Sequence, residues 1–174
     1  MGQMTKSYAL WLIPQGEVRR QLARTIRKLS RQYSTPIFAP HVTLVSSIVG
    51  PGREVTAKTT QLSKGLRPLR LRLTRLDFRD EYFRCVFVKV ARTSALARLH
   101  QKAREVLGLR GGQAFLPHLS LVYGDLPLAT KRSLVLSLGA RFDLELEVRR
   151  IDVVAIQGRP NRWRRLKSFP FGGT

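Results

Sequence analysis

One sequence frame, Pro-His-apolar-hydroxyl-Leu-Val, occurs twice in this chain, as PHVTLVSS from Pro40 and as PHLSLVYG from Pro117. Two of the three histidines in the chain, His41 and His118, occupy the same place in this frame. Each segment is a short apolar run that follows a proline, which is typical of a β-strand. The repeat therefore predicts an internal duplication, with one histidine-bearing strand in each half of the fold.

The rest of the chain alternates strands and helices in an order that fits this duplication. Apolar residues at three- and four-residue spacing predict helices over 16–33, 53–66, 93–109 and 126–139. Alternating or continuous apolar runs predict strands over 8–14, 41–49, 66–78, 83–90, 117–125, 142–158 and 162–171. We expect 66–78 and 83–90 to pair as a hairpin and 162–171 to be an edge strand.

These elements predict an α+β fold in which residues 1–174 form a single bilobal domain. We expect two lobes of antiparallel sheet, related by a pseudo-twofold axis, with helices outside them and a central cleft between them. The length of 174 residues and a hydrophobic content of 43% suffice for a core without cross-links.

The composition also bears on location and oligomeric state. No apolar run approaches the roughly 20 residues that span a bilayer, and the run near the start is predicted to be a strand rather than a signal peptide. The one cysteine, Cys85, cannot form an internal disulfide and is expected to be buried in a strand. We therefore expect a cytoplasmic protein that does not bind membranes, and a monomer.

The net charge is +21, and arginine supplies most of the positive charge. Such an excess attracts polyanions, so RNA is one partner to expect. The alternative is a general bias toward arginine that serves no partner. Few aromatic residues lie among the basic ones, so a stacking surface for single strands is not evident.

The repeated frame carries the chemistry. Residues i and i+2 of a strand point to the same side, so His41 shares a face with Thr43, and His118 shares a face with Ser120. A pair of imidazoles can remove one proton and donate another near neutral pH. Hydroxyl groups beside them can donate hydrogen bonds to phosphate oxygens. The pattern favours in-line attack on a phosphodiester at a shared cleft.

Two other uses of histidine compete with this interpretation. Two imidazoles are too few for a typical zinc site, and Asp125 is the only carboxylate close to either frame, so we expect no metal and no cofactor. A lone histidine on a strand is usually structural, but the matched repetition argues against that here. His100, alone on a predicted helix among basic residues, is interpreted as a surface residue.

With both histidine frames in view, the chain resembles the 2H phosphoesterase superfamily, and within it the cyclic nucleotide phosphodiesterases of plants and yeast. The stretches that carry the resemblance are ALWLIPQGE, FAPHVTLVSSI, YFRCVFVKV and PHLSLVYGD, in the family's order. The resemblance implies a hydrolase that opens 2′,3′-cyclic phosphates to 2′-phosphomonoesters without a metal. The implied substrates are nucleoside 2′,3′-cyclic phosphates and ADP-ribose 1″,2″-cyclic phosphate, a by-product of tRNA splicing.

The resemblance also implies roles for particular residues. His41 and His118 would be the catalytic pair, with His118 as the base that activates water and His41 as the acid. Thr43 and Ser120 would hold the phosphate. Three aromatic residues, Tyr123, Trp11 and Phe83, could contact the substrate, although each could instead serve only in packing.

Two alternatives stay open at this point. The first is a 2H enzyme that processes RNA ends, either a 2′-5′ RNA ligase or a phosphodiesterase for cyclic ends, and the arginine excess favours it. The second is an RNA-binding module without catalysis, which the intact histidines and hydroxyls in both frames argue against.

Overall fold

The computed structural model describes residues 6–112, 114–139 and 141–172 of the chain. Within these residues, the strands are β1 (Ser7–Pro14), β2 (Val42–Val49), β3 (Leu69–Phe78), β4 (Val86–Val90), β5 (His118–Val122), β6 (Arg141–Ala155) and β7 (Arg164–Pro170). The α-helices are α1 (Gly16–Tyr33), α2 (Gly52–Lys64), α3 (Ser94–Leu107) and α4 (Leu128–Leu138), and short 3₁₀ turns occupy Tyr82–Arg84 and Pro160–Arg162.

The seven strands form one antiparallel sheet in the order β1-β2-β5-β4-β3-β6-β7, with β1 also paired to β6. The long strand β6 joins the two halves of the sheet, because its first part pairs with β3 and its second part with β1 and β7. The α+β fold with antiparallel sheet is confirmed, as are the β3–β4 hairpin and the position of β7 at an edge.

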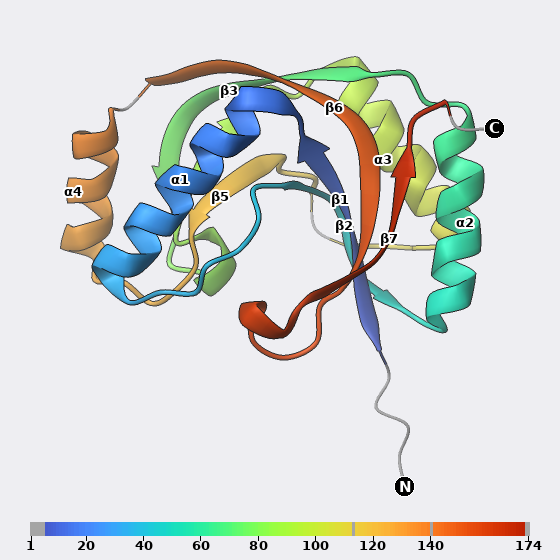
Figure 1. Cartoon of the computed structure of the whole chain (residues 1–174), viewed down its shortest axis with the longest axis horizontal. Helices are drawn as coiled ribbons and strands as arrows, with labels where there is room; N and C mark the ends of the chain where they lie inside the picture. The colour runs from blue at the N-terminus through green and yellow to red at the C-terminus, as the bar shows by residue number, and fades with distance from the viewer. Residues whose placement is uncertain (1–5, 113, 140, 173–174) are drawn as a thin grey trace, which may run out of the picture.

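The helices cover the two halves of the sheet in a crossed arrangement. Helix α1 follows β1 in the chain but packs on β5, and α3 follows β4 but packs on β2. Figure 1 shows α1 and α4 on one side of the molecule and α2 beside α3 on the other. The two halves therefore cannot separate without exposing the apolar face of both parts of the sheet.

The main core lies between the helices and the sheet, and a second, smaller apolar cluster lies on the opposite face. Strand β1 contributes to both: Tyr8, Leu10 and Leu12 point into the main core, whereas Ala9, Trp11 and Ile13 form the second cluster with Val154. Burial on both faces explains why YALWLIP is a continuous apolar run rather than an alternating one.

The largest departure from the predicted elements concerns 83–90. Strand β4 begins only at Val86, because residues 82–84 form a 3₁₀ turn held by hydrogen bonds from Arg84 N to Glu81 O and from Arg79 N to Arg84 O. Phe83 is thereby placed on a turn, where 49% of its surface is exposed. No helix among the described residues combines the length and apolar character needed to cross a membrane.

Candidate active site

The two histidine frames meet at one point of the sheet. His41 immediately precedes β2 and His118 is the first residue of β5. The two strands are antiparallel and share a single pair, Val42 with Leu119, which are the residues that follow the two histidines. In this register His41 lies opposite Ser120, and Thr43 lies opposite His118.

All four predicted groups therefore lie on one face of the sheet. Val42 and Leu119 are fully buried in the main core on the other face, and neighbouring residues of a strand alternate between faces. The structure brings the two histidines and two hydroxyls together as diagonal neighbours in one sheet, rather than on two surfaces that face each other.

Both imidazole rings are oriented in the same way. His41 Nδ1 lies 2.7 Å from the carbonyl oxygen of Ala39, and His118 Nδ1 lies 2.7 Å from that of Leu116. A carbonyl oxygen only accepts, so Nδ1 carries the proton and Nε2 presents a lone pair. A proline separates each histidine from its carbonyl partner, and its fixed φ helps to hold this geometry.

His41 lies in an apolar, aromatic setting. Its ring stacks on Trp11 at 3.6 Å between centroids and 11° between planes, and it meets Phe38 edge-on at 6.2 Å. Its Nε2 lies 3.4 Å from the hydroxyl of Tyr123. The pKa of His41, a residue only 4% exposed, is lowered from 6.5 to about 4, mainly by burial and to a smaller extent by charge on His118, while the hydrogen bond with Ala39 acts in the opposite direction.

His118 is half-buried and has a more charged setting. Burial lowers the pKa of His118, and the guanidinium groups of Arg84 and Arg79 act in the same direction, against the opposing effect of Glu81. The rings of Phe87 and His118 form a T-shaped contact with 5.2 Å between their centroids. Both imidazoles are thus neutral near pH 7 and able to accept a proton at Nε2.

The hydroxyl groups beside the histidines differ in their present partners. Ser120 is buried and donates a 2.9 Å hydrogen bond to the carbonyl of Phe83. Thr43 is half-buried on the same face. Burial raises the pKa of Tyr123, despite a hydrogen bond with Ser120 that lowers it, so this phenol stays protonated and can donate.

Four aromatic side chains border the site and form what we call the aromatic wall: Trp11, Phe83, Tyr123 and Trp163. The sequence did not predict Trp163 as one of them. The ring of Trp163 lies 5.8 Å from that of Trp11, 5.5 Å from Phe83 and 5.9 Å from Tyr123. Sequence reasoning placed Trp163 within an edge strand, but it directly follows the Pro160–Arg162 turn and its indole N–H donates to Gly158 O. The turn signal of GRPN was the available clue.

The three aromatic residues predicted from the sequence differ in their contacts with His41 and in their exposure. Tyr123 and Trp11 contact His41 directly. Core packing was an alternative for Phe83, and it is wrong, because half of this ring is exposed on its turn.

His100 and Cys85 were predicted to have no role in the site. His100 is half-buried rather than a free surface residue: its Nδ1 lies 2.8 Å from the carbonyl oxygen of Leu44 in β2, and its ring stacks on Phe115 at 3.9 Å between centroids. Cys85 is fully buried, as predicted, but it lies between the 3₁₀ turn and β4 rather than in a strand, and burial raises the pKa of its thiol.

Two cavities are bordered by residues that contact the histidines. One of about 430 Å³ is bounded by Trp11, Ala39 and Trp163, with Arg19, Arg165 and Asp152 at its border. Another, of about 540 Å³, is bounded by Leu116, with Arg79, Arg84, Arg92 and Glu81 at its border. Within the described part of the chain, no group of three or more His, Cys, Asp or Glu side chains is placed to hold a metal ion.

Comparison with known proteins places this geometry in a family. The model of the family described as "Cyclic phosphodiesterase-like protein" matches residues 4–166. This chain belongs to that family. It is a 2H phosphoesterase, and the resemblance stated from the repeated frames is confirmed.

Three individual relatives each share less than a quarter of their aligned residues with this chain. The cyclic phosphodiesterase of Arabidopsis thaliana is 23% identical over 126 residues, which cover 72% of this chain and 70% of the relative. Among solved structures, TT0787 of Thermus thermophilus has a TM-score of 0.67 at 20% identity, covering 96% of this chain and 98% of its own. LigT of E. coli, solved with 3′-AMP, also has a TM-score of 0.67, at 13% identity, covering 97% and 99%. These structures show the same fold.

Proposed function

We propose that the protein hydrolyses 2′,3′-cyclic phosphates to 2′-phosphomonoesters with two histidines and without a metal. The observation that carries this proposal is that His41 and His118 share one sheet face, each with Nδ1 held by a carbonyl so that Nε2 presents its lone pair, which in His41 faces the Tyr123 hydroxyl. The printed name of the Arabidopsis relative, cyclic phosphodiesterase, supports the reaction class.

In the proposed reaction, His118 Nε2 removes a proton from water as the water oxygen attacks phosphorus. The bond from phosphorus to O3′ breaks, and His41 donates a proton to the departing oxygen. One water is consumed, and the product carries the phosphate on O2′. After the reaction His118 is protonated and His41 is neutral, and proton exchange with solvent restores the starting state of both rings. Each transfer contributes a factor of roughly 10²–10⁴ in rate.

The low pKa of His41 makes the bound phosphate part of this mechanism. In the free protein, burial keeps His41 neutral near pH 7. A phosphate anion beside the ring raises its pKa by charge attraction, so substrate binding favours the protonated acid. The same anion is stabilised by hydrogen bonds from Thr43, Ser120 and the protonated phenol of Tyr123.

Substrate beyond the phosphate would meet the aromatic wall. Trp11, Phe83 and Trp163 offer ring faces and edges at the border of the site. A nucleobase is an apolar, planar group that packs well against such rings. This arrangement supports a nucleoside rather than a simple sugar as the carrier of the cyclic phosphate.

The test is incubation of the purified protein with 2′,3′-cyclic AMP and excess chelator, with 2′-AMP and 3′-AMP separated by chromatography. We expect 2′-AMP, and a loss of at least about 100-fold in rate for His41→Gln and for His118→Gln. Ser120→Ala tests phosphate binding, and Ser137→Ala is its matched control, because Ser137 also donates to a backbone carbonyl but lies in α4. Formation of 3′-AMP, or dependence on a metal, would contradict the proposal.

A second candidate is that the natural substrate is an RNA end bearing the cyclic phosphate. The observation in its favour is the cavity that Leu116, the carbonyl partner of His118, borders. Three arginines line it, of which Arg79 and Arg84 are paired there with Glu81, and the chain has a net charge of +21. Such cations would contact backbone phosphates. A short RNA with a cyclic end should then have a higher kcat/KM than 2′,3′-cyclic AMP, and the advantage should fall as salt rises. Equal values for both substrates would reject RNA as the preferred substrate.

A further inference from the structure

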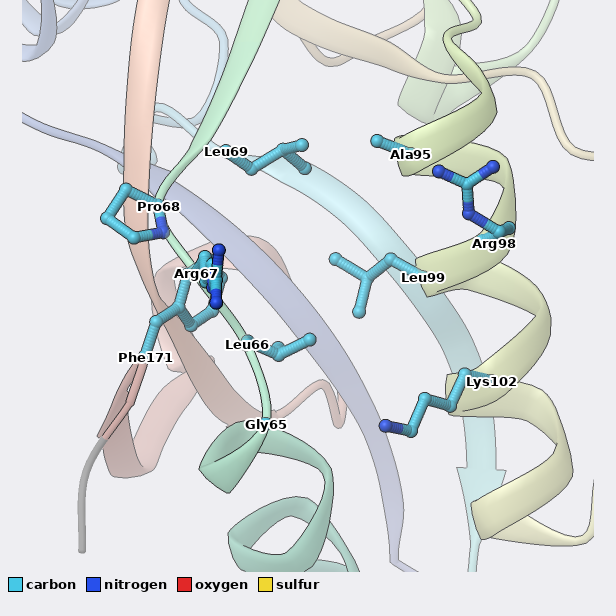
Figure 2. Close-up of a pocket in the computed structure, with 10 residues that line it drawn as sticks. All are labelled: Gly65, Leu66, Arg67, Pro68, Leu69, Ala95, Arg98, Leu99, Lys102 and Phe171. Atoms are coloured by element: carbon cyan, nitrogen blue, oxygen red, sulfur yellow. The ribbon is translucent and has the colours of Figure 1, made fainter.

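A separate pocket lies between helix α3 and the segment that leads from α2 into β3. It has a volume of about 480 Å³. Figure 2 shows Gly65–Leu69 on one side, Ala95, Arg98, Leu99 and Lys102 of α3 on the other, and Phe171 behind. None of the predicted catalytic, phosphate-binding or aromatic site residues borders it.

The floor of this pocket is apolar. Leu99 is a buried core residue whose side chain reaches the pocket, and Leu66, Leu69 and Phe171 are partly buried residues that pack against the main core. Phe171 is held in place by the backbone, since its N–H donates to Arg149 O and the N–H of Gly172 donates to Ser63 O. The pocket thus offers a fixed apolar surface that is open to water, which favours a ligand with an apolar body.

Three cations border the same pocket, and none of them is neutralised. Arg98 and Lys102 lie one turn apart on α3, and Arg67 lies on the opposite wall. None of the three takes part in an ion pair among the described residues. Figure 2 shows Lys102 extending toward Gly65, so its ammonium reaches across the opening of the pocket. The borders therefore complement a ligand with more than one negative charge.

We propose that this pocket is a second binding site for a phosphomonoester with a flat apolar body, the chemistry of a nucleoside monophosphate. The base packs against Leu66, Leu99 and Phe171, and the dianionic phosphate pairs with Arg98 and Lys102, which lie one turn apart on α3. The volume suits a ligand of this size. The choice of 2′-AMP as probe rests on the proposed function, because that compound is its expected product; the pocket itself does not depend on that function.

The experiment is a calorimetric titration of the full chain with 2′-AMP, which the enzyme has no bond left to open. We expect two sites in the wild-type protein. In Arg98→Gln/Lys102→Gln, affinity at the pocket should fall at least about tenfold, while the catalytic cleft and its activity are unchanged. Adenosine, which lacks the charge, and inorganic phosphate, which lacks the apolar body, should each bind the pocket at least about tenfold more weakly than 2′-AMP.

Two further variants separate the pocket from general charge. Arg27→Gln/Arg31→Gln removes the same charge at the same spacing, but from an exposed face of α1, and should leave two sites. Ala95→Phe fills the pocket without changing charge and should abolish the second site. One site in the wild-type protein, or equal loss from both double variants, overturns the proposal. Two sites without hydrolysis of any cyclic phosphate would instead reject the proposed function and leave the pocket intact.

Discussion

Acidification should destabilise this fold through His41. The pKa of His41 is about 4 in the folded protein and 6.5 when the ring is free in water. Between these values the unfolded chain binds a proton that the folded chain does not, so stability falls as pH drops below 6.5 and the loss is complete near pH 4. This difference between the two pKa values corresponds to about 3 kcal/mol in the free energy of unfolding.

The physical origin of this cost is the environment of the ring. Trp11 covers one face of His41, and the carbonyl of Ala39 already occupies Nδ1, so a charged ring would have little water and no anion to stabilise it. About 3 kcal/mol is a substantial share of the roughly 5–15 kcal/mol that typically separates folded from unfolded domains.

The assay is urea denaturation of the wild-type protein and His41→Gln at pH 7.5, 5.5 and 4.5. Glutamine cannot take up the proton, so the variant should lose about 2.5 kcal/mol less than the wild-type protein between pH 7.5 and pH 4.5. Acid-sensitive carboxylates contribute equally to both proteins and cancel in the comparison. If both lost the same free energy, the argument that burial lowers the pKa of His41 would be refuted.

Three other outcomes follow from the site. Because the pKa values of both His41 and His118 are lowered, kcat/KM should peak below pH 6.5 and fall above the peak as the acid loses its proton; a peak above pH 7 would contradict this. Trp11→Leu should expose His41 and move the peak toward higher pH, measured from the same profile. His100→Leu should cost about 1–3 kcal/mol in urea denaturation, because the carbonyl of Leu44 loses its partner; a change under about 0.5 kcal/mol would restore the surface interpretation of His100.

Local sequence patterns were sufficient to predict the helices and strands and to identify the candidate catalytic groups. The spacing of apolar residues predicted all four helices, because that spacing is set by the turn of the helix itself. Gly108, in the left-handed conformation, ends α3 at Leu107, two residues before the predicted end at 109. Likewise, the two-residue period of a strand was sufficient to predict that each histidine shares a face with the hydroxyl residue two positions later.

The partners of these groups depend on contacts between distant parts of the chain. The β2–β5 register at Val42 and Leu119, the turn that exposes Phe83, and the approach of Trp163 to Tyr123 all join segments far apart in sequence. His100 illustrates the same point, because its partner in β2 is brought to it by the crossed packing of α3.

Residue types and their spacing along the chain were enough to identify the groups that could do the chemistry: two histidines, two hydroxyls and the strands that carry them. Contacts between distant segments place these groups on one sheet face, cover His41 with Trp11, and bring arginines beside His118. Periodicity along a chain fixes the direction of a side chain within its own element, whereas burial, and with it the pKa of each imidazole, depends on the residues that the rest of the fold packs against it.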